Sequence, residues 1–208
     1  MPERPMDFIA IDFETADTRP DSPCELGLAI VRGGVVREAR SWLIKPACHP
    51  WFSPFNVAVH GIRPEHVANA PDFAGVWAEV APMLVNQVLV AHNAAFDMGV
   101  LRASLTSARI PLPELRYFCS VSMARRVWPG KRSYGLGVLC AEHGIAFRHH
   151  RAGDDSAATA ELVLRATERH GAADIGRFLN GIRLGTGSLG PQGQRTPGGK
   201  FIPVVAGY

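Results

Sequence analysis

The sequence predicts an α/β domain, in which buried β-strands alternate with amphipathic helices. Residues 8–15 form an apolar run rich in Ile and Phe, which is typical of a buried strand. Two further extended runs flank Gly33 and Gly34, and this pattern indicates a β-hairpin. Apolar residues recur at helical spacing in residues 73–84, shortly before another short apolar run at residues 88–91.

The first three predicted strands are neighbours in one sheet. They cover residues 8–15, 26–31 and 35–44, and the Gly-Gly turn places the second strand beside the third. Residues 46–54 read as irregular, and Pro64 is suited to open a short helix.

Helices dominate the second half of the chain. The short strand at residues 88–91 runs into a polar stretch that precedes the next helix. After the helix at residues 73–84, further helices are predicted at residues 98–108, 121–127, 136–143 and about 154–170.

Composition indicates one ordinary globular domain. The 208 residues are 47% hydrophobic and 20% charged, and the net charge of +3 permits a polyanionic substrate. The four cysteines show no Cys-x-x-Cys pairing, so reduced thiols are expected and a zinc framework is not. No apolar run reaches membrane-spanning length and no signal-peptide pattern is present, so a cytoplasmic location without membrane contact is expected.

The composition changes near the C-terminus. Glycine, proline, serine and glutamine dominate from Gly185 to Lys200, which predicts a flexible tail. We therefore divide the chain into a domain at residues 1–182 and a Gly/Pro-rich tail at residues 183–208. The tail contains a formal dinucleotide-binding fingerprint at residues 185–190, but neither a predicted strand nor a helix flanks it. Because every candidate catalytic residue precedes the tail, truncation is expected to leave the folded core and its chemistry largely intact.

Two carboxylates lie together at the end of the first strand. Side chains alternate along a strand, so Asp12 and Glu14 project from the same face. Two buried carboxylates repel each other unless a cation lies between them. The alternative interpretation is a strand that ends in a solvated loop at Asp12.

Two further acids lie at the starts of predicted helices. Asp97 follows a buried strand, where it could be only a helix cap, but His92, Asn93 and Phe96 nearby also suit a nucleotide. Asp155 begins the stripe of small and apolar residues along the helix at residues 154–170.

Helical phase separates Asp155 from its neighbour. Asp154 shares its face with Glu161 and Arg165. Asp155 is therefore expected to be buried and Asp154 to be exposed. Of the two adjacent histidines, His150 lies five residues before Asp155, whereas His149 could be a surface residue.

Four acids and a histidine suggest phosphoryl transfer at a two-metal site. Carboxylate oxygens select Mg²⁺ or Mn²⁺ over zinc, and a pair of such ions can stabilise both the attacking and the leaving oxygen. A histidine near the ions can take the proton from the attacking water, since its pKa lies near neutrality.

These residues, in this order, resemble the DEDDh branch of the DnaQ-like exonuclease superfamily. The matching stretches are Asp12-Phe13-Glu14-Thr15, residues 92–97, and His150 with Asp155, and residues 60–65 and 122–126 are also similar to the family. The resemblance covers roughly residues 6–170 and leaves the tail outside.

The resemblance implies an RNase H-like fold, with a mixed five-stranded sheet and helices on both faces. It implies hydrolysis of single-stranded DNA or RNA from the 3′ end to nucleoside 5′-monophosphates, most similar to the proofreading subunit of bacterial DNA polymerase III. Two Mg²⁺ or Mn²⁺ ions would be held by Asp12, Glu14, Asp97 and Asp155, and His150 would be the general base. The residues implied to contact the terminal nucleotide are Phe13, Thr15, His60, Asn93 and Phe96.

Two alternatives stay open. An RNA exonuclease of the oligoribonuclease or RNase T type would use the same acids, so the sequence does not distinguish DNA from RNA. A catalytically silent nucleic-acid-binding module is the other alternative, although binding alone does not require four clustered carboxylates. The sequence identifies neither a polymerase partner nor an oligomeric state.

Overall fold

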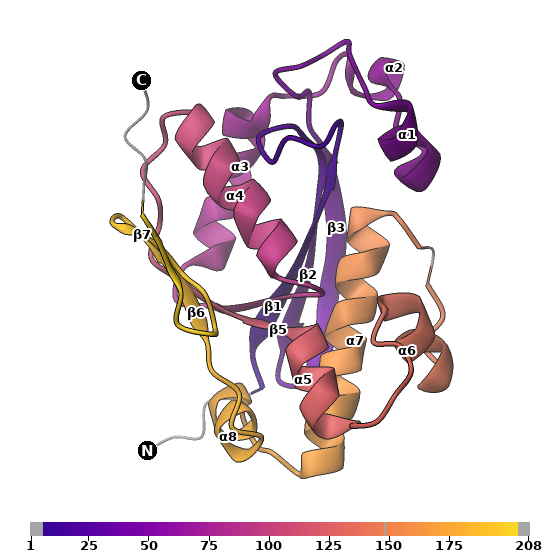
Figure 1. Ribbon diagram of the computed structural model, residues 1–208, viewed down its shortest axis with the longest axis vertical. Coiled ribbons are helices and arrows are strands. Elements are labelled where there is room, and N and C mark those ends of the chain that lie inside the picture. Colours follow the sequence, from indigo (N-terminus) through magenta and orange to yellow (C-terminus); the bar gives the residue numbers. More distant parts are fainter. Residues whose placement is uncertain (1–5, 148, 204–208) are drawn as a thin grey trace.

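The fold is a mixed β-sheet with helices packed on both of its faces (Figure 1). We describe it from a computed structural model, covering residues 6–147 and 149–203. The strand order is β3-β2-β1-β4-β5-β6-β7-β8. Within the described residues, none of the helices combines the length and apolar character needed to cross a membrane.

Strand β1 lies at the centre of the first five strands, whose order is β3-β2-β1-β4-β5. The bounds are Phe8–Thr15 for β1, Pro23–Arg32 for β2, Val35–Leu43 for β3, Val88–Ala91 for β4 and Leu115–Cys119 for β5. The pairs β1–β2 and β2–β3 are antiparallel, whereas β1–β4 and β4–β5 are parallel. The short strand β5 carries the charged residue Arg116, and its apolar pattern is too brief to predict a strand from the residues themselves.

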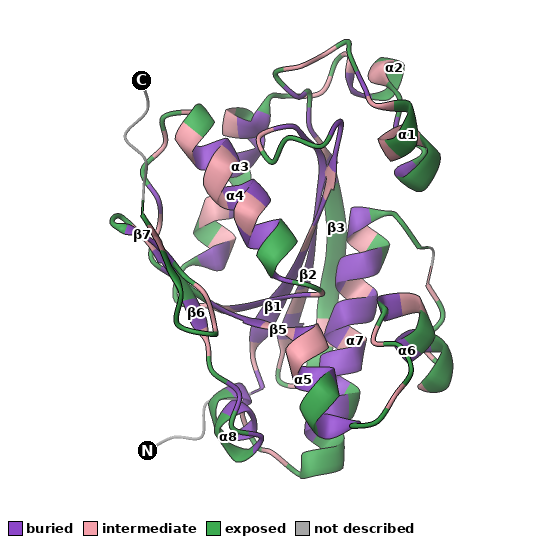
Figure 2. Cartoon of the chain, viewed as in Figure 1, coloured by how far each residue is buried: buried purple, intermediate pink, exposed green. Residues whose placement is uncertain are grey.

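Alternation along β1 separates two hydrophobic layers. Ile9 and Ile11 pack with α3 (Phe73–Leu84) and α4 (Ala95–Ser107) on one face. Phe8 and Ala10 face the other layer. The helices of that second layer are α5 (Ser120–Val127), α6 (Leu136–Glu142), α7 (Ala152–His170) and α8 (Ile175–Gly181). Figure 2 shows the buried inner faces of these helices against the sheet. The predicted RNase H-like α/β fold, with a mixed sheet between two helical layers, is confirmed.

Among the described residues the sheet has eight strands, where five were predicted. The three additional strands are β6 (Gly187–Gly190), β7 (Gly193–Arg195) and β8 (Phe201–Pro203). Strand β6 pairs with β5, so the glycine-rich segment continues the sheet and does not form the flexible tail that composition indicated.

A glycine makes this pairing possible. A Cβ at Gly187 would lie 2.4 Å from the Tyr117 ring, so only glycine fits at that point of β6. Leu189 on the same strand is buried in the core. Glycine therefore serves close packing here, where composition alone indicated disorder. The division of the chain at residue 182 stays a prediction.

Two short helices form a small layer over the end of β1. They are α1 (Pro54–His60) and α2 (Pro64–Val67), and Pro64 opens α2 as predicted. A small cluster joins them to the sheet through Ala16, Cys24, Phe52, Ile62 and Val67. This layer places the residues of α1 beside the end of β1, where the predicted site lies.

Candidate active site

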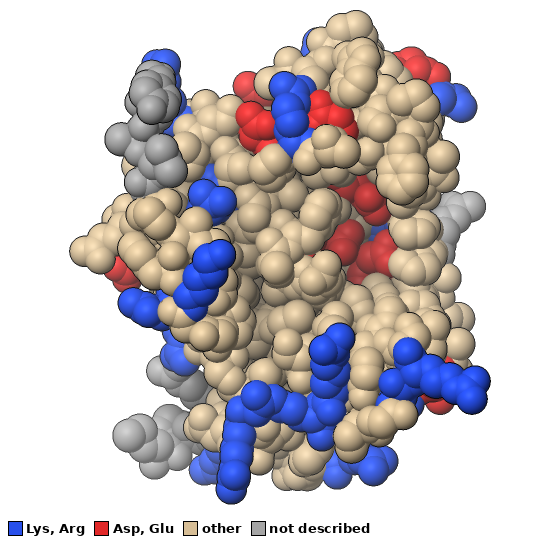
Figure 3. Space-filling model, viewed as in Figure 1, with Lys and Arg blue, Asp and Glu red and all other residues tan. Residues whose placement is uncertain are grey.

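Three carboxylates from two elements meet at one point. Asp12 and Glu14 project from β1 toward the α7 layer, and Asp155 projects from the first turn of α7. One oxygen of each lies within 4.8 Å of the other two. Such a set of hard oxygen ligands fits Mg²⁺ or Mn²⁺. Figure 3 shows acidic atoms gathered in a hollow on this face of the molecule.

The two neighbouring aspartates of α7 have the environments that helical phase predicts. Asp155 is 4% exposed, whereas Asp154 is exposed. The Asp155 carboxylate accepts a hydrogen bond from the Arg151 backbone N–H at 3.0 Å. Its other oxygen lies 3.0 Å from Nδ1 of His149. The first turn of α7 therefore fixes Asp155 in place and leaves Asp154 in solvent.

Asp97 is also buried beside the end of β1, at 1% exposure in the first turn of α4. Its carboxylate accepts a hydrogen bond from the Phe13 backbone N–H at 3.1 Å, which ties α4 to β1. Among the described residues, the cluster of three ligand oxygens does not include Asp97. Its role toward a metal stays a prediction.

The acids raise one another's pKa values. Burial raises the pKa of Asp12 well above its usual range, and the charges of Asp97, Asp155 and Glu14 add to this. Burial, then the charge of Asp155, raises the pKa of Glu14 to about 8. Burial likewise raises the pKa of Asp97 to about 8. Without a cation, these buried and half-buried carboxyls favour the neutral form.

The metal-free protein is expected to be less stable at pH 9 than at pH 7. Unfolded carboxyls have pKa values near 4, whereas Glu14 and Asp97 have pKa values of about 8 when folded. Between these values only the folded state holds the protons, so stability is lost as the pH rises through about 8. Above pH 7, histidine titration contributes little.

Thermal melting of chelator-treated protein measures this trend. Adding Mn²⁺, which binds deprotonated carboxylates, should stabilise the protein most at the higher pH. A metal-free Tm that rises from pH 7 to pH 9 would contradict the effect assigned to these acids.

The adjacent histidines lie at the entrance to the site. His149 contacts Asp155, and its ring stacks on that of His150 at a centroid distance of 4.1 Å. Both side chains are exposed, and His150 has a left-handed backbone with φ of 63°. The structure thus brings the His149 ring against Asp155 of the acid cluster. The general-base role of His150 stays a prediction.

Two other histidines serve as connections between elements. His92 lies 2.8 Å from the Ser120 hydroxyl and 3.0 Å from the Tyr134 carbonyl, and burial lowers its pKa to about 4. His60 is buried, and its Nε2 lies 3.1 Å from the Thr15 carbonyl. Its Nδ1 accepts the Ile62 backbone N–H, so Nε2 is the donor toward Thr15. The contact of His60 with a nucleotide stays a prediction.

The other residues predicted to contact the nucleotide differ in how far their side chains are exposed. Phe96 is 46% exposed and Asn93 is exposed at the loop before α4, where its φ is 71°. Thr15 is largely buried at the end of β1. The ring of Phe13 lies in the core at 2% exposure, so this residue presents no ring to a ligand.

A hollow of about 450 Å³ lies at the end of β1, lined by the loop after this strand and by residues of α1 and α4. Its lining includes Thr15 and Phe96, which directly neighbour Glu14 and Asp97 in the chain. Phe55 of α1 also lines the hollow and is 76% exposed. Exposed aromatic rings beside a polar site are suited to stacking on bases.

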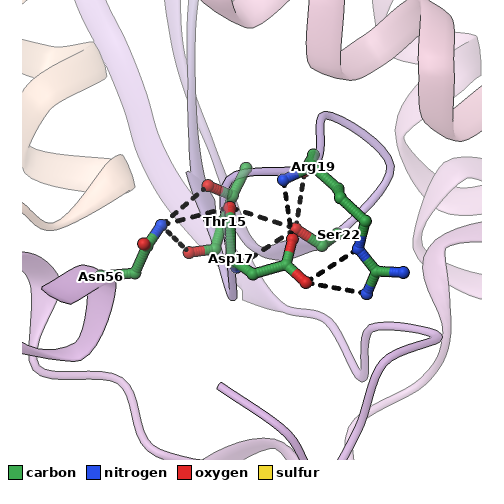
Figure 4. Close-up of polar contacts among 5 residues, drawn as sticks. All are labelled: Thr15, Asp17, Arg19, Ser22 and Asn56. Carbon is green, nitrogen blue, oxygen red and sulfur yellow. Dashed lines mark hydrogen bonds and ion pairs between the residues drawn. The ribbon is translucent and has the colours of Figure 1, made fainter. Parts of the chain in front are cut away.

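Sequence reasoning missed Phe55 and its neighbour Asn56. The Asn56 side-chain amide donates to the Thr15 carbonyl at 2.9 Å and to the Asp17 carbonyl at 3.3 Å, which fastens α1 to the loop after β1 (Figure 4). In the same loop, Asp17 pairs with Arg19 at 2.8 Å. The aromatic residues around residue 55 were the signal in the sequence that could have indicated a binding segment.

Comparison with known proteins gives consistent matches. A family model described as an exonuclease, RNase T, matches residues 9–163, which is more than half of the chain. The chain is 33% identical over 152 residues to DNA polymerase III PolC-type of Streptococcus pneumoniae, covering 71% of this chain and 10% of that protein. It is 30% identical over 168 residues to 3′-5′ exonuclease DinG of Bacillus subtilis, covering 78% of this chain and 18% of that protein.

A solved structure agrees with these matches. Exonuclease X in complex with 5′ overhanging duplex DNA is 28% identical with a TM-score of 0.65, covering 80% of this chain and 95% of that chain. The chain spans less than a fifth of the length of the two curated relatives described above. The matched residues 9–163 contain all four acids and both adjacent histidines. The chain therefore belongs to the exonuclease family, in the DEDDh branch of the DnaQ-like superfamily.

Proposed function

We propose that this chain is a metal-dependent 3′→5′ exonuclease that releases nucleoside 5′-monophosphates from single-stranded nucleic acid. The observation that carries this proposal is the meeting of Asp12, Glu14 and Asp155 within 4.8 Å. The hollow at the end of β1, lined by Phe55 and Phe96, adds a surface suited to bases. Single-stranded DNA is the first candidate substrate, because the relatives include a DNA polymerase and a DNA-bound exonuclease.

Each acid has a role in the proposed site. Asp12, Glu14 and Asp155 would hold one Mg²⁺ or Mn²⁺, and Asp97 would support a second ion near Asp12. When bound, the ions would neutralise charge on the phosphate and activate the attacking water. The partly buried setting of the acids would strengthen their hold on a cation, because the lower dielectric weakens screening.

Other residues would orient the substrate and move the proton. Phe96 and Phe55 would stack on bases at the 3′ end, and Thr15 and Asn93 would contact the sugar and phosphate. His150 would accept the proton of the attacking water. Its exposed position at the start of α7 gives the ring room to turn toward the acids.

Replacing His150 with Ala should therefore slow hydrolysis more than replacing His149 does.

Activity is expected to depend completely on a divalent cation. Four acids that repel one another need the cation to be deprotonated together, so excess chelator should abolish turnover and added Mn²⁺ or Mg²⁺ should restore it. With 5′-labelled single strands, products should shorten stepwise. With 3′-labelled strands, the label should appear at once as a mononucleotide.

Matched DNA and RNA oligonucleotides of one sequence complete this experiment. Faster degradation of DNA would support the first candidate, and faster degradation of RNA would support the alternative of an RNA exonuclease. Undiminished turnover in excess chelator would refute the metal-dependent mechanism. Metal binding and strand binding without any hydrolysis would instead favour the silent binding module.

A further inference from the structure

A fifth carboxylate lies beside the acid cluster and has no part in the proposed chemistry. Glu25 is on β2 and pairs in register with Glu14 of β1. Residues directly opposite each other project to the same face of a sheet, so Glu25 faces the α7 layer as Glu14 does. Its side chain is 1% exposed. Burying an acid next to several others destabilises the folded state unless hydrogen bonds or ion pairs compensate for the lost hydration.

The contacts of Glu25 lead to the start of α7. One oxygen accepts a hydrogen bond from the Ala152 backbone N–H at 3.1 Å. The other accepts one from the Ser41 hydroxyl of β3 at 2.8 Å and lies 3.7 Å from the Arg151 guanidinium. Glu25 therefore joins β3 and β2 to the two residues at which α7 begins.

A glycine on the same strand brings α7 to this position. A Cβ at Gly27 would lie 1.9 Å from the Ala152 carbonyl oxygen, so the start of α7 rests directly on the β2 backbone. Gly27 pairs in register with Asp12. Glu25 and Gly27, two residues apart on one face of β2, thus both contact the first turn of α7, next to the two acids of β1.

We propose that Glu25 is a positioning residue, which holds the first turn of α7 so that Asp155 meets Asp12 and Glu14. Asp155 lies three residues after Ala152 and accepts the backbone N–H of Arg151. The two residues that Glu25 contacts are thus in the same turn as Asp155. Movement of this turn would move Asp155 away from the other two acids. The inference rests on the proposed function for its consequence in catalysis, but metal binding tests it separately.

The contacts favour positioning over direct metal ligation. Both Glu25 oxygens already accept hydrogen bonds from protein groups. In the part of the chain that the structure describes, the cluster of ligand oxygens consists of Asp12, Glu14 and Asp155 and does not include Glu25. A glutamine at this position could still accept the Ala152 N–H through its carbonyl oxygen, whereas an alanine could not.

The test compares Glu25→Gln with Glu25→Ala, using Mn²⁺ binding measured by calorimetry and the rate on a short labelled oligonucleotide. Glu25→Ala should weaken Mn²⁺ binding and slow hydrolysis by about 10–100-fold, the range typical of groups that orient metal ligands. Glu25→Gln should stay within about threefold of the original chain. Gly27→Ala, which forces the start of α7 away from β2, should resemble Glu25→Ala.

Val31→Ala is the matched control for stability. Val31 is on β2, fully buried in the α7 layer, and distant in register from Glu25. This variant should lower the Tm and leave Mn²⁺ affinity unchanged. Unchanged Mn²⁺ affinity in Glu25→Ala would overturn the proposal, and equal loss in Glu25→Gln and Glu25→Ala would indicate direct ligation instead. If the original chain binds Mn²⁺ but hydrolyses no strand, the proposed function fails while the binding comparison still decides the role of Glu25.

Discussion

Asp155→Asn should lower the rate of hydrolysis by roughly two to three orders of magnitude or more, because it would remove a charge that holds the metal in the proposed site. Asparagine keeps the shape of the side chain and can still accept the Arg151 N–H. Asp154→Asn removes only an exposed charge near a helix N-terminus, so it should cost about 0.3–1 kcal/mol of stability and little activity. The adjacent pair therefore provides its own matched control.

Single-turnover hydrolysis of a short labelled oligonucleotide at saturating Mn²⁺ measures the difference. Melting curves should show that both variants fold. In metal-free protein Asp155→Asn should melt at or above the original temperature, because burial raises the pKa of this acid, and burial together with the charge of Asp155 raises the pKa of Glu14. A dead Asp154→Asn variant beside a normal Asp155→Asn variant would show that the third motif has been assigned to the wrong residue.

Removal of residues 185–208 should strongly destabilise the fold, which reverses the expectation from composition that the tail is dispensable. The truncation deletes β6, uncovers the edge of β5 and exposes the surface around Tyr117. It also removes the hydrogen bond from the Gln194 side-chain amide to the Tyr117 hydroxyl at 2.8 Å. Hydrolysis should persist at temperatures where the truncated chain stays folded, because the described acid cluster precedes this segment.

A single substitution tests the packing of β6 with a smaller change than the truncation. Leu189 is 1% exposed, so Leu189→Ala should cost about 2–5 kcal/mol. For a chain of this size that lowers the Tm by roughly 4–20 °C. Phe201→Ala is the control, because Phe201 on β8 is half exposed and its ring lies against the Arg195 guanidinium, a contact worth under about 1 kcal/mol. A truncated chain that melts like the full chain would show that the added strands contribute nothing to stability.

The sequence by itself determined the elements whose patterns are local. The apolar run with alternating acids set β1 and placed Asp12 and Glu14 on one face. Helical periodicity alone separated the buried Asp155 from the exposed Asp154. These patterns depend on spacing along one element, and spacing is visible in the sequence.

Only the tertiary structure decided features that depend on contact between distant segments. Gly187 lies against Tyr117, so a glycine-rich segment that reads as flexible becomes a strand of the sheet. Glu25 meets the start of α7 across 127 positions of the chain, and nothing in its local sequence marks it as part of the site. Close approach and burial arise from packing between elements, and a residue's own neighbours in the chain do not specify them.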